Sequence, residues 1–236
     1  MNNKGSLYLI PNTLGSDSFE ESIPSGIGSK LRNIAVIFVE HPKEARRLLI
    51  GIGLKDKLDD IQLISINNGM TAEDKKLAVE TLNSGKDIGL LSDAGCPAIA
   101  DPGNEIVALA HSVQARVIPL TGPSSILLGL MASGFNGQSF AFHGYLPKDQ
   151  NQRKKKIRDL EKEMYQKSQT QIFIETPYRN QHLLMDLLSE CQKKTKICLA
   201  LDLGMPEENI QVQTVENWIK NTPGIEKKQC LFLLYK

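Results

Sequence analysis

Two short turns near the middle of the chain carry residue types that suit a ligand site. Residues 92–97 read SDAGCP, and residues 121–125 read TGPSS. Glycine lets a ligand come close to the backbone, and the hydroxyls of Ser124 and Ser125 offer hydrogen bonds. Together the turns predict a pocket. The alternative is that they are ordinary connections of the kind that every α/β protein contains.

Each turn follows a short apolar segment that predicts a strand. Residues 88–91 end at the first turn, and residues 116–120 end at the second. Between them, Asp101 and Pro102 predict a helix start, as the cap and the first helical residue. A further helix is predicted over residues 124–133. The strand–helix–strand order implies parallel strands, so we expect both turns at the carboxyl ends of neighbouring strands, where open α/β sheets bind ligands.

Composition indicates an ordinary globular chain of 236 residues, with 41% hydrophobic and 23% charged residues. The net charge of +1 excludes a strongly basic nucleic-acid scaffold, although it allows a local basic patch. No apolar segment approaches the ~20 residues that span a bilayer, and no signal-peptide pattern is present. We therefore expect a cytoplasmic protein without membrane contact.

The cysteines and histidines indicate neither disulfides nor a metal. The four cysteines form no CxxC pair, which is typical of reduced cytosolic thiols. The four histidines lack metal-ligand spacing, so we predict no structural metal. Cys96, within the first turn, is expected to fill space rather than to act as a nucleophile.

The remaining pattern predicts two α/β domains, residues 1–144 and 153–236, joined by a linker at residues 145–152. Further strands are predicted at residues 6–10, 34–39, 61–66, 140–144, 171–174, 196–201 and 231–235, and further helices at 45–50 and 71–84. A helix that follows the linker carries seven basic residues from Arg153 to Lys167, interleaved with acidic ones. It is either a solvated face or an RNA-binding patch.

The strings SDAGCPAIADPG (residues 92–103) and IPLTGPSS (residues 118–125) resemble the signature of the tetrapyrrole-methylase superfamily of S-adenosylmethionine-dependent methyltransferases. The similarity is greatest to the branch that 2′-O-methylates a cytidine ribose of 16S ribosomal RNA. It extends to three further strings, FAFHGYLP (140–147), IFIETPYR (172–179) and LYLIPNTLG (7–15).

This resemblance implies an α/β fold with two mostly parallel central sheets and a cleft for the methyl donor between the domains. It implies methyl transfer from S-adenosyl-L-methionine to a ribose of small-subunit ribosomal RNA, without a metal. By resemblance we also expect a homodimer and, as a partner, ribosomal RNA or the small ribosomal subunit.

The resemblance also implies roles for individual residues. Substrate would contact Asn12, Lys43 and Arg179, and the catalytic base would be Glu40 or Glu175. The alternatives are a solvated helix cap at Glu40 and an ordinary surface ion pair at Glu175. The donor would be bound by Pro11, Asp93, Gly95, Cys96, Pro97, Ile99, Ala100, Asp101, Ser124, Ser125, Ala200 and Leu233.

Two segments depart from the resembled branch. Residues 40–43 read EHPK where that branch usually has Glu-Asp-Thr-Arg, and residues 200–205 read ALDLGM where it usually has Ala-Arg-Glu-Leu-Thr-Lys. Expected basic residues are missing in these segments, which puts the identity of the methyl acceptor in question. Two alternatives to a ribosomal RNA methyltransferase stay open. One is a methyltransferase that acts on a tetrapyrrole or another small molecule, and the other is a non-catalytic protein that binds S-adenosylmethionine.

Overall fold

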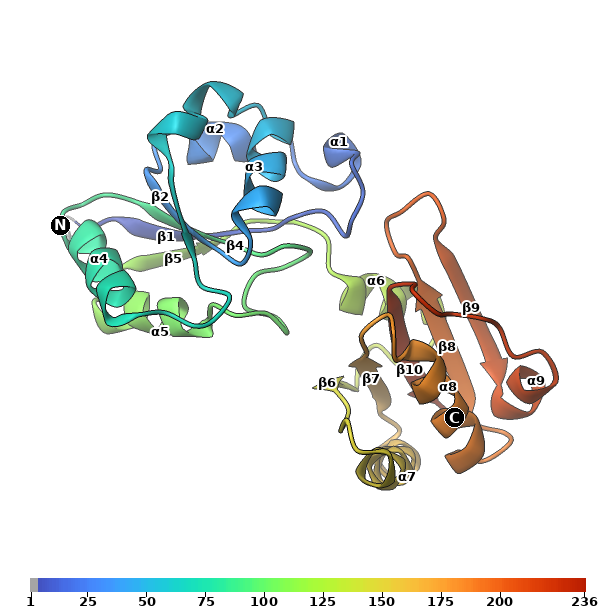
Figure 1. Ribbon diagram of the computed structural model, residues 1–236. Coiled ribbons are helices and arrows are strands. Elements are labelled where there is room, and N and C mark those ends of the chain that lie inside the picture. The colour runs from blue at the N-terminus through green and yellow to red at the C-terminus, as the bar shows by residue number, and fades with distance from the viewer. Residues whose placement is uncertain (1–3) are drawn as a thin grey trace. The chain divides into compact units, whose positions relative to one another are not determined.

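The computed structural model describes residues 4–236 and divides into two compact units, Met1–Ser124 and Ser125–Lys236 (Figure 1). Each unit has its own sheet and its own helices, which confirms the predicted α/β class. No helix within residues 4–236 is both long enough and apolar enough to cross a membrane.

The first unit is built on a parallel sheet of five strands in the spatial order β3-β2-β4-β1-β5. Its strands are β1 (Ser6–Ile10), β2 (Val36–Val39), β3 (Gln62–Ser65), β4 (Ile88–Leu91) and β5 (Arg116–Pro119). Its helices are α1 (Phe19–Ser22), α2 (Ile27–Leu31), α3 (Pro42–Gly51), the 3-10 helix η1 (Lys55–Asp60), α4 (Ala72–Asn83) and α5 (Asn104–Ser112). All five strands were predicted.

Two apolar cores cover opposite faces of this sheet. Alternate residues of β2 show the division, because Ile37 and Val39 belong to one core while Val36 and Phe38 belong to the other. The first core includes side chains of α2 and α3, and the second includes side chains of α4 and α5. Figure 1 shows these two helix pairs on opposite sides of the sheet. Burial on both faces explains why the inner strands β2 and β4 are nearly uninterrupted apolar segments.

The strand order corrects one prediction. Strands β4 and β5 are parallel, as expected, but they are not neighbours, since β1 lies between them and pairs with both. A strand–helix–strand pattern gives the direction of two strands, but it does not reveal a third strand that an earlier segment inserts between them.

The second unit contains a mixed sheet in the order β6-β7-β10-β8-β9. Only β6 and β7 are parallel in this sheet and its other pairs are antiparallel, so the expectation of a mostly parallel second sheet is wrong. Its strands are β6 (Phe140–Tyr145), β7 (Thr170–Ile174), β8 (Lys196–Leu201), β9 (Asn209–Thr214) and β10 (Cys230–Tyr235). Its helices are α6 (Ser125–Ser133), α7 (Gln150–Lys167), α8 (Asn180–Glu190) and α9 (Val215–Lys220).

The division between the units comes earlier than the predicted linker at residues 145–152. Strand β6 pairs with β7 and therefore belongs to the second sheet. Helix α6 also belongs to the second unit, where a Cβ built on Gly129 would be 2.4 Å from Leu231 of β10. The predicted linker includes the first turn of α7, which Asp149 caps by accepting a hydrogen bond from the Gln152 amide. Turn-forming residues alone do not distinguish a linker from a helix cap.

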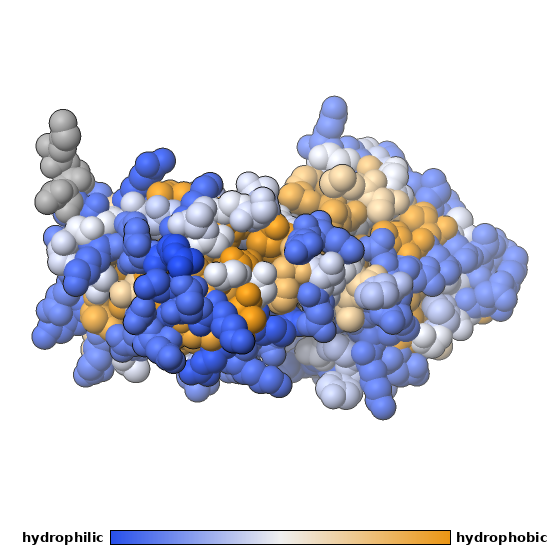
Figure 2. All heavy atoms as spheres, turned by 90° about the horizontal axis from the view of Figure 1, so that it is seen from above, coloured by the Kyte–Doolittle hydropathy of each residue, from blue (hydrophilic) through white to orange (hydrophobic). Residues whose placement is uncertain are grey.

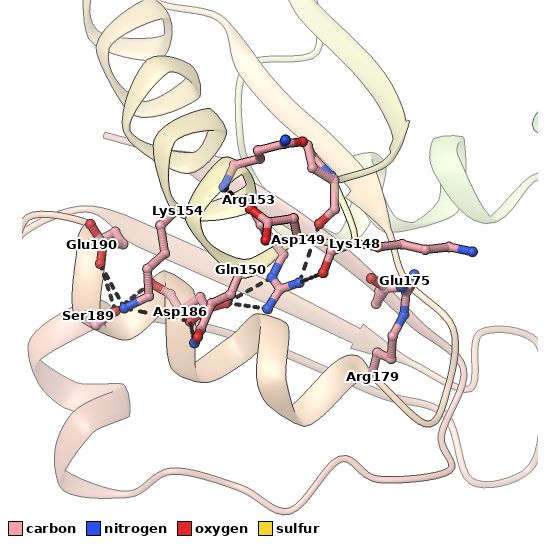
Figure 3. Close-up of polar contacts among 12 residues, drawn as sticks. Lys148, Asp149, Gln150, Arg153, Lys154, Glu175, Arg179, Asp186, Ser189 and Glu190 are labelled. Atoms are coloured by element: carbon pink, nitrogen blue, oxygen red, sulfur yellow. Dashed lines mark hydrogen bonds and ion pairs between the residues drawn. The ribbon is translucent and has the colours of Figure 1, made fainter.

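The charged helix α7 is fastened to α8 by a buried ion pair (Figure 3). Arg153 is 7% exposed and donates to Asp186 Oδ2 from Nε at 2.8 Å and from Nη2 at 2.7 Å. The same guanidinium donates to the carbonyls of Pro147 and Lys148. Arg153 therefore belongs neither to a solvated face nor to an RNA patch, because its charge is used inside the unit.

Helix α6 is apolar nearly all round, a pattern that is typical of a buried helix. Gly129, Leu130 and Ser133 are buried, but Leu127 and Met131 are exposed. On the face drawn in Figure 2, hydrophobic residues are interspersed with hydrophilic ones.

We predict that Asp186→Ala destabilises the protein by about 3–5 kcal/mol, because it leaves the Arg153 charge buried without its partner. Urea unfolding followed by circular dichroism measures the change. The matched control is Glu216→Ala, which removes a solvent-exposed pair with Lys220 and should change stability by less than about 0.5 kcal/mol. Equal effects of the two substitutions would contradict the prediction.

Candidate functional site

Three turns meet at the carboxyl edge of the first sheet. They follow β1, β4 and β5, whose carboxyl ends lie at one edge because the strands are parallel. The turns after β1 and β4 are joined by an isolated bridge in which the Asn12 amide donates to the Gly95 carbonyl at 2.9 Å. The turns after β4 and β5 also meet, since Cys96 Sγ lies 3.4 Å from the Pro123 carbonyl oxygen. Although β1 separates β4 from β5, their turns are therefore in contact.

The Asn12 side chain holds two of these turns together. It is 0% exposed, and its Nδ2 donates to the carbonyls of Ser92 at 3.3 Å and Asp93 at 2.8 Å. Its Oδ1 accepts from the Thr13 amide at 2.8 Å. The structure therefore gives Asn12 a positioning role, which differs from the predicted contact with substrate.

Two glycines allow the turns to pack this closely. Gly95 has a φ of 67°, a left-handed conformation that favours glycine. A Cβ built on Gly122 would be 2.2 Å from Pro11 Cβ, so no larger residue fits there without displacing the turn after β1.

The segment after Pro97 has an unfavourable backbone. Ala98 and Ala100 have φ values of 65° and 62°, and this conformation costs a residue with a Cβ roughly 1–2 kcal/mol. Between them Ile99 is 52% exposed. Strained backbone is concentrated at ligand sites, so this exposed apolar side chain is a candidate for ligand contact.

The predicted helix start at Asp101 and Pro102 is wrong. Helix α5 begins at Asn104, and its N-cap is Gly103 with a φ of 123°. A Cβ on Gly103 would be 2.6 Å from a methyl carbon of Leu90, so the close approach of the chain to β4 determines where the helix begins. Asp101 is thereby left in the loop, as part of the candidate site.

Three carboxyl groups lie near one another beside these turns: Glu40 after β2, Asp93 after β4, and Asp101. Glu40 Oε1 accepts a hydrogen bond from the Asp93 amide at 3.0 Å. Burial, together with the charges of Glu40 and Asp93, raises the pKa of Asp101 to about 7. Burial also raises the pKa of Glu40 above its ordinary value. Such a cluster favours a cation in its vicinity.

His41 is the next residue of this cluster, and no role for it was predicted. Its Nδ1 lies 2.5 Å from Asp93 Oδ2, and its backbone amide donates to Asp93 Oδ1 at 3.2 Å. Its Nε2 lies 3.0 Å from the side-chain amide nitrogen of Asn67. Both Asp93 oxygens therefore face His41, and the predicted contact of Asp93 with the donor stays a prediction.

In the second unit, Glu175 and Arg179 form an ion pair directly after β7 (Figure 3). Glu175 Oε1 accepts from Arg179 and from the Thr176 amide. Glu175 is 6% exposed, which does not fit the alternative of an ordinary surface ion pair. The carboxylate is suited to orienting Arg179, which is partly exposed.

The other predicted site residues have varied surroundings. Lys43 is exposed on the first turn of α3, while Ser124 and Ser125 are half-buried where the units divide. Ala200 and Leu233 are buried strand residues, and Ala200 packs near Gly129 of α6. The predicted donor contacts of these residues stay predictions. Among residues 4–236 no three His, Cys, Asp or Glu side chains are arranged to hold a metal ion.

Comparison with known proteins identifies relatives that match almost the whole chain, although no family model matches. Ribosomal RNA small subunit methyltransferase I of Vibrio cholerae is 29% identical over 234 residues, which are 97% of this chain and 76% of that protein. The protein of the same name from Bacillus subtilis is 32% identical over 229 residues, which are 96% of this chain and 74% of that protein.

The chain belongs to the ribosomal RNA small subunit methyltransferase I family. Membership confirms the predicted class of enzyme, an S-adenosylmethionine-dependent methyltransferase. His41 was missed because it lies where the chain departs from the resembled branch. The difference between EHPK at residues 40–43 and the usual Glu-Asp-Thr-Arg was the signal that could have identified His41.

The fold of this family member is similar to those of solved tetrapyrrole-modifying enzymes. The methyltransferase CobJ aligns with a TM-score of 0.65 at 17% identity, over 98% of this chain and 94% of that one. Uroporphyrin-III C-methyltransferase from Thermus thermophilus, solved with S-adenosylhomocysteine, aligns with a TM-score of 0.56 at 14% identity, over 98% of each chain. At these identities the similarity shows the fold alone.

We predict that Asp101→Asn stabilises the protein more at pH 8 than at pH 5. The pKa of Asp101 is ordinary, about 4, in the unfolded chain and about 7 in the folded one, so the folded state loses stability as pH rises between these values. The asparagine in the variant does not ionise, so the folded variant does not lose stability in this way. The difference in Tm between variant and wild type, measured by scanning calorimetry, should therefore grow with pH. A difference independent of pH would contradict the raised pKa.

Proposed function

We propose that this enzyme transfers the methyl group of S-adenosylmethionine to a ribose 2′-hydroxyl of small-subunit ribosomal RNA. The observation that carries the proposal is the similarity to ribosomal RNA small subunit methyltransferases I across both units, at 29–32% identity over 96–97% of the chain. The ribose hydroxyl as acceptor follows from the resemblance of the sequence motifs to the ribose-methylating branch.

The three turns of the first unit are the donor site in this proposal. Backbone groups around Gly95 and the apolar side chain of Ile99 would contact the nucleoside, with the partly exposed hydroxyl of Ser124 close by. The carboxyl groups of Glu40 and Asp101 have raised pKa values, and the sulfonium charge of the donor would favour their ionised forms. The donor supplies an electrophilic methyl group, so the enzyme's tasks are to align the reactants and to exclude water.

Lys43 and Arg179 are the proposed contacts of the RNA backbone. Lys43 is exposed, and Arg179 is oriented by the buried Glu175. A guanidinium held in place binds phosphate with defined geometry, whereas a lysine acts as a mobile point charge. Further cations of α7 would add an electrostatic contribution that falls as salt rises.

The alternative acceptor, a tetrapyrrole or another small molecule, lacks a supporting observation beyond the fold, which hosts different acceptors. A non-catalytic binding protein is not favoured by membership in a family of methyltransferases. An enzyme that modifies ribosomal RNA works where ribosomes are assembled, so we place it in the cytoplasm. The homodimer and the position of the donor between the domains stay predictions.

The donor site is tested by Ile99→Ala. Losing part of an apolar contact should weaken binding of S-adenosylhomocysteine about 5- to 30-fold, which corresponds to about 1–2 kcal/mol. Tm should hardly change, because Ile99 is half exposed. Titration calorimetry measures the affinity. Ile219→Ala, at an isoleucine of equal exposure on α9, is the control and should bind like wild type. Equal affinities of the two variants would exclude Ile99 from the site.

The function is tested by incubating the purified protein and labelled donor with small ribosomal subunits from cells that lack it. We expect one 2′-O-methylated ribose in the small-subunit RNA, mapped by mass spectrometry of nuclease fragments. Labelling of a tetrapyrrole or another small molecule, with the RNA unlabelled, would overturn the acceptor. Donor binding without transfer to any of these would overturn the enzymatic proposal.

A further inference from the structure

His41 and Asp93 form a hydrogen-bonded pair at the edge of the candidate donor site. Asp93 lies two residues before Gly95, and His41 follows β2, so separate strands bring the two side chains together. Asp93 uses both oxygens on His41, one for the ring at 2.5 Å and one for the backbone amide at 3.2 Å. The backbone contact fixes the carboxylate, which in turn fixes the plane and the direction of the ring.

The neighbours of the ring determine its tautomer. A carboxylate can only accept a hydrogen bond, so Nδ1 carries the proton when it faces Asp93 Oδ2. In the neutral ring Nε2 then has a lone pair, and the Asn67 side-chain amide, 3.0 Å away, donates to it. An acceptor nitrogen on a ring oriented by a carboxylate is the arrangement of a general base.

We propose that His41 is the general base that takes the proton from the acceptor hydroxyl, with Asp93 as the residue that positions it. This inference rests on the proposed function, because it requires a hydroxyl acceptor. The side chain of His41 is 54% exposed, so a substrate can reach Nε2 by displacing a neutral amide. Displacing the neutral amide of Asn67 costs less free energy than breaking an ion pair would.

The step balances without a co-reactant. The 2′-hydroxyl gives its proton to Nε2, and an oxygen lone pair forms the new bond to the methyl carbon. The carbon–sulfur bond breaks, and its electrons remain on the sulfur of the neutral product S-adenosylhomocysteine. The imidazolium, stabilised by Asp93, then releases the proton to water, so each turnover yields one methyl ether and one proton.

The competing carboxyl groups are less suited to this task. Glu175 is buried and bound to Arg179, so neither a hydroxyl nor water reaches it easily. Glu40 Oε1 is committed to the Asp93 amide, where it supports the turn that carries Asp93. Asp101 has no described partner that orients it, and it lies within a cluster of like charges.

Three carboxylates from separate elements face the ring, and they determine how it titrates. Asp93 is in direct contact, and Glu40 of the turn after β2 and Glu44 of α3 are nearby. The hydrogen bond with Asp93 and these charges raise the pKa of His41 above its usual value. Because a base must be neutral, kcat/KM should rise with pH through this raised pKa and then level off.

The test compares His41→Gln and His41→Ala with wild type on small ribosomal subunits. We expect kcat/KM to fall about 100- to 10,000-fold in both variants. The rise with pH should disappear, and added imidazole should restore part of the activity of His41→Ala. Affinity for S-adenosylhomocysteine and Tm should stay near wild type. The control is His111→Gln, at an exposed histidine of α5, which should match wild type throughout.

The inference is overturned if wild type methylates the RNA and His41→Gln retains activity within about threefold. It is also overturned if the rise with pH persists in His41→Gln, because another group would then be the base. Failure of the proposed function gives a different result: wild type itself leaves the RNA unmethylated while binding the donor normally. That result would overturn the function and, with it, this role of His41.

Discussion

The buried amide of Asn12 is the interaction on which the candidate site depends. It joins the turns after β1 and β4, and each of its polar atoms has a partner inside the protein. Replacing it would leave buried carbonyls without donors, at a cost of about 1–3 kcal/mol for each such group. Hydrogen bonds within the protein therefore hold the turns in position. Because the entropy cost of ordering these turns is largely incurred during folding, ligand binding incurs little of it.

The same edge of the sheet accumulates negative charge at the expense of stability. Burial and the neighbouring Glu40 and Asp93 raise the pKa of Asp101 to about 7, so that its ionisation lowers the stability of the folded state. A structural role would not require three carboxyl groups in so small a space, but a cationic ligand would benefit from them. Functional sites commonly contain groups that lower the stability of the folded protein. The left-handed alanines on either side of Ile99 add strain to the same loop.

Those parts of the structure that depend on residues close together in the sequence could be predicted from it. The helix at residues 71–84, which begins at a capping box of Thr71 and Asp74, and the strand at residues 88–91 were predicted because residues close in the sequence determine them. The insertion of β1 between β4 and β5 could not be predicted, since it depends on contacts between distant segments. The contact between His41 and Asp93 could not be predicted either, because 52 positions separate the two residues. The burial of Arg153 could not be predicted either, because the sequence of a charged helix does not show which of its basic residues is buried.

In the function proposed above, the turns around Asn12, Gly95 and Pro123 together bind the methyl donor. Hydrogen–deuterium exchange of the protein with and without S-adenosylhomocysteine tests it most directly, because it locates the site without any substitution. We expect the ligand to slow the exchange of backbone amides at residues 11–14, 92–101 and 121–125 together. Protection confined to other segments, with these three unchanged, would contradict it.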